Sequence, residues 1–139
     1  AGDVGYKIPA PTHLGKHKSV SQALKGIKAG KARWKNNELT KQSASVIARL
    51  ECINPGENAW NSTINDPKLR LNVKNVRMSQ IYRRLHPDQP SYTVTGSGGG
   101  GTHVYHWEEP RALTNRERAC IQTFPRSYEF YGSKESVRK

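Results

Sequence analysis

The decisive stretch of this chain is Thr93-Val-Thr-Gly-Ser-Gly-Gly-Gly-Gly-Thr-His-Val-Tyr-His-Trp107. Five glycines fall between Gly96 and Gly101, with a β-branched run before them and an aromatic run after them. Glycine held in a regular element costs roughly 0.5–1 kcal/mol relative to alanine. A glycine cluster at the end of a strand therefore indicates a place where the backbone comes close to another molecule.

The rest of the chain is strongly basic. Its 139 residues contain 23 Lys and Arg against 11 Asp and Glu, which gives a formal net charge of +12. Residues 1–37 carry eight of these basic side chains and a single acidic one, Asp3. A surface of this charge attracts phosphate, and its combination with a glycine run and aromatic residues indicates a nucleic-acid partner.

Composition also excludes several classes of protein. The cysteines, Cys52 and Cys120, lie far apart and outside any Cys-x-x-Cys pattern, so we expect no disulfide scaffold and a reducing cytoplasm. No apolar run approaches the roughly 18 residues of a membrane span, and no signal peptide is visible. His103-Val-Tyr-His106 lacks nearby cysteine or carboxylate partners, and its histidines fall on opposite faces of a strand, so we expect no metal site.

Three short helices are expected. Ser19-Val-Ser-Gln22 has the spacing of a capping box and opens a helix over 20–27. Apolar residues recur at helical spacing over 41–53. Thr114-Asn-Arg-Glu117 is a second capping box, and the helix that it opens must stop before Pro125.

Strands are expected where the side-chain pattern changes from helical spacing to alternation at every second residue. Ile81, Arg83 and Leu85 would alternate with Tyr82 and Arg84 along a strand. Further strands are expected over 92–95 and 103–107, which are rich in β-branched and aromatic residues. Arg83 and Arg84 are adjacent and would point to opposite faces of a flat strand. At most one of them can then face DNA, where an arginine is the strongest available reader of guanine.

The C-terminal third identifies a family. The segment Arg111-Ala-Leu-Thr-Asn-Arg-Glu-Arg-Ala-Cys-Ile-Gln-Thr-Phe-Pro-Arg-Ser-Tyr-Glu-Phe130 resembles the ninth motif of the cytosine-5 DNA methyltransferases. That motif has an Arg-x-Leu start, an Arg-Glu pair, an alanine, and then a Phe-Pro turn followed by an aromatic residue. Arg126 stands where the family usually has an aspartate.

Other segments resemble the same family in the same order. Residues 82–95 are similar to the lead-in of its target recognition domain, and Gly98 to Gly101 to the glycine loop that follows. Residues 6–13 resemble the segment just after the eighth motif, and residues 19–27 the short helix that comes next. The resemblance implies an α+β fold, a small target recognition domain with short twisted β-strands and a few short helices.

The resemblance also implies a division of residues 1–139. Residues 1–37 would be a basic lead-in after the eighth motif, 38–107 the variable recognition region with the glycine loop, and 108–139 the ninth motif. The chain ends about where the tenth motif would begin, so we expect a piece excised between the eighth and tenth motifs.

The catalytic parts of the family are missing. Its nucleophile is a cysteine preceded by proline, whereas Cys52 follows a glutamate and Cys120 an alanine. Glu57-Asn58 is not followed by the valine of the family's catalytic Glu-Asn-Val. The Gln-x-Arg-x-Arg of the eighth motif and the Phe-x-Gly-x-Gly loop for S-adenosylmethionine are absent. We therefore expect no catalytic residue, no bound cofactor, and no activity of the chain alone.

The resemblance implies sequence-specific recognition of double-stranded DNA. The glycine run would face the groove and help open the target pair for base flipping, and Thr93 would contact a phosphate near the flipped nucleotide. The expected DNA-binding residues are Arg83, Arg84, Thr93, Thr95, Gly96, Ser97, Gly98, Gly99, Gly100, Gly101, Thr102 and His103. The intact bacterial restriction-modification enzyme would transfer a methyl group from S-adenosylmethionine to cytosine, and the chain would need the catalytic domain as its partner.

Alternatives follow from the same residues. The glycine run could be a flexible linker or a phosphate loop, although no Gly-Lys-Ser/Thr follows it. Within the family, the chain could be the small subunit of a split enzyme that a large subunit completes. Outside the family, it could be a non-enzymatic basic nucleic-acid-binding module, such as a ribosome-associated or architectural protein. The ninth-motif resemblance argues against that module.

Overall fold

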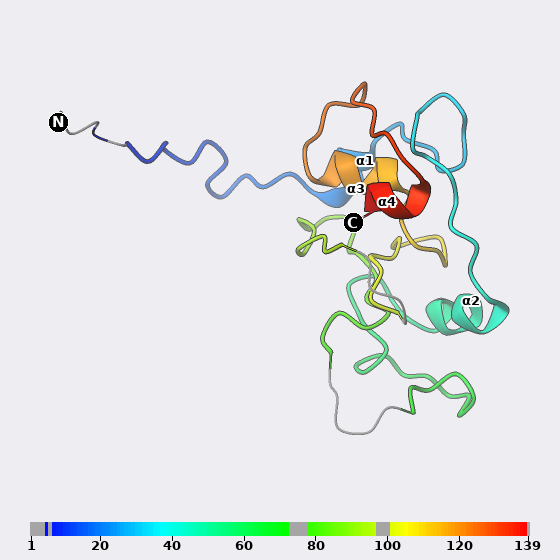
Figure 1. Ribbon diagram of the computed structural model, residues 1–139. Helices are drawn as coiled ribbons and strands as arrows, with labels where there is room; N and C mark the ends of the chain where they lie inside the picture. The colour runs from blue at the N-terminus through cyan, green and yellow to red at the C-terminus, as the bar shows by residue number, and fades with distance from the viewer. Residues whose placement is uncertain (1–4, 6, 73–77, 97–100, 139) are drawn as a thin grey trace.

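The computed structural model of the chain consists mainly of loops and turns around four short helices (Figure 1). It describes residue 5 and residues 7–72, 78–96 and 101–138. The helices are α1 (Val20–Leu24), α2 (Ala44–Glu51), α3 (Asn115–Ile121) and α4 (Lys134–Arg138). Helix α3 contacts both α1 and α4, and α2 lies apart from these three (Figure 1). Residues 7–18 extend away from the rest as an irregular lead-in (Figure 1).

The α+β prediction with short twisted strands was wrong. The described residues contain no strand, only isolated bridges that join Tyr105 to Arg84 and to Ala112. Between residues 82 and 85, successive backbone N–H groups donate to acceptors in different parts of the chain. The N–H of Tyr82 donates to Gly101 O (2.7 Å), that of Arg84 to Glu57 O (2.9 Å), and that of Leu85 to Tyr105 O (3.0 Å). A ladder needs one continuous partner, and Tyr82 leaves the β region altogether with φ at +48°.

The predicted capping boxes are confirmed. At α1, Ser19 Oγ accepts from the Gln22 N–H (3.3 Å), and Gln22 Oε1 accepts from the Ser19 N–H (3.0 Å). The helix stops at Leu24, three residues before its expected end, because Gly26 takes a positive φ of +80°. Helix α2 is likewise shorter than the predicted 41–53.

Helix α3 begins at the second predicted box. Thr114 Oγ1 accepts from the Glu117 N–H (3.1 Å), and a Glu117 carboxylate oxygen accepts from the Thr114 N–H (2.8 Å). The same carboxylate forms two hydrogen bonds with the guanidinium of Arg111, at 2.8 and 2.9 Å. Glu117 therefore fixes both the start of α3 and the loop before it.

Two apolar clusters share the segment 104–105. Tyr105 belongs to the cluster that includes Leu50, Ile53 and Ile81, whereas Val104 belongs to the cluster that packs α1 against α3. Tyr105 also stacks on Tyr82, with ring centroids 5.7 Å apart. Successive residues of one extended segment thus face the two clusters and hold them together.

Arg84 occupies the centre of this arrangement. Its side chain is 6% exposed and donates to four carbonyl oxygens: Leu50 and Ile53 through Nη1 (both 2.9 Å), His106 through Nε (2.9 Å) and Trp107 through Nη2 (2.6 Å). Leu50 lies in the last turn of α2, where orphan carbonyls favour a cation. Arg84 therefore ties the end of α2 to residues 106–107.

A second buried arginine joins the loop before α2 to the C-terminal segment. Arg116 is fully buried, and its side chain donates to Lys35 O (2.9 Å) and to Tyr128 O (2.5 Å). Asn36, with φ at +59°, accepts from the Arg116 N–H (2.7 Å) and exchanges two hydrogen bonds with Phe130. The basic loop before α2 is thereby fixed against the Arg111–Phe130 segment.

Gly101 is required by packing. Its φ is +92°, and a β-carbon added to it would lie 2.5 Å from Cε2 of Tyr82. The Gly101 carbonyl accepts from the Tyr82 N–H at 2.7 Å, so the two residues cannot move apart without losing that bond. The C-terminal end of the glycine run is thus held against the core.

Replacement of Arg84 by methionine is expected to lower the free energy of unfolding by about 3–5 kcal/mol, because buried carbonyl oxygens would lose their donors. Arg83→Met is the matched control. Arg83 is half-buried and its guanidinium lies 4.9 Å from the ring centroid of Tyr92, a contact worth about 1 kcal/mol or less. Urea denaturation of both variants measures the difference. Equal losses would contradict the central role of Arg84.

Gly101→Ala is expected to lower the free energy of unfolding by about 2–4 kcal/mol, since backbone strain at positive φ adds to overpacking against Tyr82. Gly15→Ala is its control, because Gly15 also has a positive φ (+72°) but nothing within 4 Å of the added carbon. The control carries only the strain of positive φ and should lose about 1–2 kcal/mol. Similar thermal and urea midpoints for the two variants would refute the packing argument.

Candidate nucleic-acid interface

The residues before the glycine run alternate between surface and interior. Thr93, Thr95 and Gly96 are exposed, whereas Val94 packs against the cluster that joins α1 and α3. The carbonyl of Thr95 accepts from Nη2 of Arg118 in α3. The run therefore leaves the core from a fixed point, with two threonine side chains on the outside. The predicted contacts Ser97, Gly98, Gly99 and Gly100 lie outside the described residues.

The residues after the run are more enclosed. Gly101 is buried, and Thr102 and His103 are half-buried. The imidazole of His103 packs edge-on against Tyr105, with ring centroids 6.1 Å apart. Burial lowers the pKa of His103, and the guanidiniums of Arg138 and Arg118 lower it further. His103 is therefore a neutral hydrogen-bonding group near pH 7.

The two adjacent arginines have different surroundings. Arg83 is half-buried, with its guanidinium over the ring of Tyr92, whose hydroxyl donates to the Arg83 carbonyl at 2.8 Å. Burial raises the pKa of that tyrosine. Arg84 is committed to four backbone carbonyls inside the core, so we leave it out of the proposed DNA contacts.

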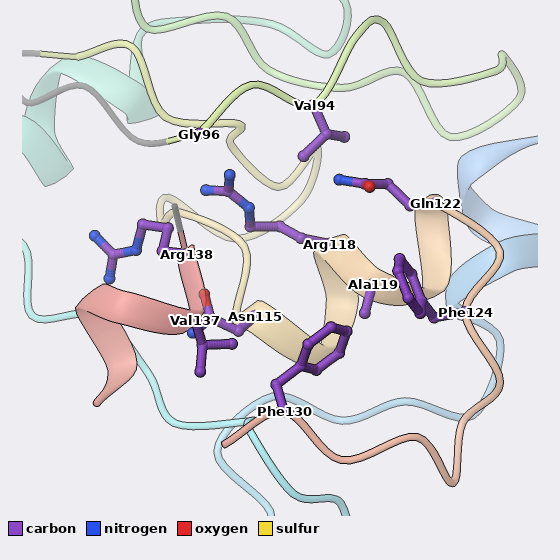
Figure 2. Close-up of a pocket in the computed structure, with 10 residues that line it drawn as sticks. All are labelled: Val94, Gly96, Asn115, Arg118, Ala119, Gln122, Phe124, Phe130, Val137 and Arg138. Atoms are coloured by element: carbon purple, nitrogen blue, oxygen red, sulfur yellow. The ribbon is translucent and has the colours of Figure 1, made fainter. Parts of the chain in front are cut away.

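A cleft of about 290 Å³ opens beside Gly96 (Figure 2). Val94 and Gly96 lie on one side of it, and α3 supplies Asn115, Arg118, Ala119 and Gln122. Arg138 of α4 and the aromatic rings of Phe124 and Phe130 complete the lining (Figure 2). The structure thus brings Gly96, a predicted site residue, together with two arginines.

Sequence reasoning missed Arg118 and Arg138 as site residues. A usable signal existed for the first, because Asn115, Arg118, Ala119 and Gln122 are spaced to lie on one face of the helix that the second capping box opens. No comparable signal existed for Arg138. It enters the site through the contact between α3 and α4, which no local pattern predicts.

The described residues offer neither a metal centre nor a membrane-spanning helix. Within the described parts of the chain, no group of three or more His, Cys, Asp or Glu side chains is arranged to hold a metal ion. Among the same residues, no helix has the length and apolar character needed to cross a bilayer.

Comparison with known proteins identifies the family. The model of the family C-5 cytosine-specific DNA methylase matches residues 5–139. Type II methyltransferase M.BbvI of Brevibacillus brevis is 62% identical over 137 residues, which are 99% of this chain and 36% of the relative. Type II methyltransferase M.NgoFVII of Neisseria gonorrhoeae is 40% identical, over 96% of this chain and 36% of the relative.

A shorter relative also matches. Type II methyltransferase M.AquIB of Picosynechococcus is 36% identical over 100 residues, which are 72% of this chain and 62% of the relative. No solved structure matches. The chain spans about a third of the length of M.BbvI and M.NgoFVII. Because the family match extends over nearly the whole sequence, the chain belongs to the C-5 cytosine-specific DNA methylase family.

Proposed function

We propose that this chain is the DNA-recognition part of a bacterial restriction-modification methyltransferase that transfers a methyl group from S-adenosylmethionine to cytosine in duplex DNA. The observation that carries the proposal is the family match over residues 5–139 in a chain without a Pro-Cys nucleophile. The segment 38–107 supplies the variable recognition region, residues 1–37 the basic lead-in after the eighth motif, and residues 108–139 the ninth motif.

The proposed contact surface is centred on the glycine run. Exposed Thr93, Thr95 and Gly96 lie on its N-terminal side, and half-buried Thr102 and His103 on its C-terminal side. Arg83 is proposed to reach the same groove, because its guanidinium rests on an aromatic ring and is not committed to the core. Ser97, Gly98, Gly99, Gly100 and Gly101 are proposed on the family resemblance, and the net charge of +12 supports a phosphate-rich partner.

The chemistry of the cysteines supports a role in recognition. A nucleophilic cysteine must be a thiolate. Cys120 is buried, and burial raises the pKa of its thiol. The thiol of Cys52 donates to the carbonyl of Ala48 at 3.4 Å, on the inside of the α2 turn. The environment of Cys120 therefore disfavours a thiolate.

The cleft beside Gly96 does not fit S-adenosylmethionine. This cofactor, which supplies the methyl group when bound to the intact enzyme, carries a positive sulfonium and ribose hydroxyls that an acidic side chain typically binds. The described residues that line the cleft include Arg118 and Arg138 but no carboxylate. We therefore propose no cofactor contact there.

A second candidate is the small subunit of a split methyltransferase. The relative M.AquIB favours it, since 100 aligned residues make up 62% of that protein. M.AquIB is thus only about 160 residues long. That is less than half the length of M.BbvI, of which 137 residues are 36%. In either form of the proposal, this chain selects the target sequence and another part of the enzyme performs the transfer.

Selection from a random duplex library tests the recognition role. At physiological salt, the chain is expected to enrich one short sequence, with an affinity at least tenfold above that for unrelated duplexes. Specific protein–DNA complexes typically bind about 10³–10⁷ times more tightly than the same protein binds non-specific DNA. Binding to all duplexes alike, with a steep salt dependence, would instead identify a non-specific basic module.

An assay of methyl transfer from labelled S-adenosylmethionine distinguishes a recognition part of a single enzyme from the small subunit of a split enzyme. The chain alone is expected to incorporate no label into duplex DNA, because it lacks a suitable nucleophile. Mixing it with a chain that carries the Pro-Cys and cofactor motifs should restore transfer if it is a natural small subunit. Label incorporated by the chain alone would refute the recognition-part proposal.

A further inference from the structure

We propose that the cleft between Gly96, α3 and α4 binds a phosphodiester of the DNA backbone through the guanidiniums of Arg118 and Arg138. This inference rests on the proposed DNA-recognition function and adds a binding site to it. Neither arginine belongs to the surface proposed above, and the cleft lies beside Gly96 (Figure 2).

Both arginines line the same cleft. Figure 2 shows the Arg118 side chain reaching from α3 toward Gly96, with the Arg138 side chain extending from α4 on the same side of the cleft. The two charges also act on each other and on His103: repulsion from Arg138 adds to burial in lowering the pKa of Arg118, and both guanidiniums lower the pKa of His103. Two like charges that line the same cleft therefore lie close enough to repel each other.

No carboxylate compensates them within the described residues. The ion pairs formed there, with Glu109 and Glu117, both belong to Arg111. Arg118 is only 8% exposed, and a buried cation without a partner is costly. A bound anion would remove both the burial cost and the repulsion, so the cleft favours a negatively charged group.

The guanidiniums keep donors for such a group. Arg118 uses Nη2 for the carbonyl of Thr95, and Arg138 uses Nη2 for the hydroxyl of Thr40 at 3.2 Å. Each guanidinium has five N–H donors. Among described residues, the buried side-chain atoms without a partner lie in Trp60, Gln80 and Arg116, so the remaining nitrogens of Arg118 and Arg138 are not sealed in the interior. Planar guanidiniums bind phosphate oxygens in pairs.

The position of the cleft favours a backbone phosphate over a base. Arg118 holds the carbonyl of Thr95, the residue before the glycine run begins. A phosphate bound to Arg118 would lie at the foot of the run and fix how the run enters the groove. Contacts to phosphate set the register and orientation of a protein on duplex DNA. A phosphate contact at Arg118 would therefore orient the glycine run on the duplex.

Arg138→Gln tests the site, because Arg138 lies on a short helix with no buried residue and its loss should leave the fold intact. Arg126→Gln is the matched control: Arg126 is exposed, donates to Lys25 O at 2.7 Å, and does not line the cleft. For a duplex selected by the chain, we expect about a tenfold loss of affinity and a salt slope reduced by about 0.9 for Arg138→Gln. The control should stay within about twofold.

A titration with inorganic phosphate, at ionic strength held constant with chloride, tests the cleft without DNA. Phosphate should shift the side-chain Nε–H resonance of Arg118, and the shift should disappear in Arg138→Gln but persist in Arg126→Gln. Arg118→Lys keeps the charge but loses the paired donors, and should weaken duplex binding about as much as Arg138→Gln.

Three results would overturn the inference. Equal affinity losses in Arg138→Gln and Arg126→Gln would mean that only overall charge matters. No phosphate-dependent shift would mean that the cleft is not an anion site. A shift with unchanged duplex affinity in Arg138→Gln would assign the cleft to free phosphate or to an acidic protein partner. Failure of the recognition role is seen separately, as duplex binding without sequence preference.

Discussion

The structure depends on the hydrogen bonds that the Arg84 guanidinium makes to backbone carbonyls. In most domains of mixed structure, extended segments satisfy their polar groups along a ladder. Here the segments around Tyr105 form only isolated bridges, and one buried side chain binds carbonyls from the end of α2 and from residues 106–107. Arginine alone has enough donors in one plane to do this.

The buried arginines divide into two kinds. Arg84 donates to four backbone carbonyls. Arg116 donates to two, and its Nη1 is buried without a partner among the described residues. Arg118 is nearly as buried, yet it makes one such bond, is repelled by Arg138 and lines a cleft. Burial alone therefore does not distinguish the two core arginines from Arg118, the proposed phosphate ligand.

Helices α1, α2 and α3 were predictable from sequence because their signals are local, whereas α4 was not expected. Ser19 with Gln22, and Thr114 with Glu117, specify a helix start through atoms three residues apart, and both boxes form. The expected strands failed because alternation reports which side chains face the interior and says nothing of what the backbone pairs with. Ile81 and Leu85 are buried as expected of core residues, but the backbone of their segment is shared between two partners, residues 56–59 and 101–105. The separate fates of Arg83 and Arg84, and the approach of Arg138 to α3, arise from contacts across the chain.

The glycine run is attached at both ends through main-chain oxygens. The carbonyl of Thr95 is bound by Arg118, and that of Gly101 by the backbone of Tyr82. Replacing side chains between these two points removes neither attachment, and doubling the length of the segment costs only about 0.6 kcal/mol in closure entropy. We therefore expect target preference to be able to diverge by substitution and insertion between residues 96 and 101, while the framework that presents this segment stays the same.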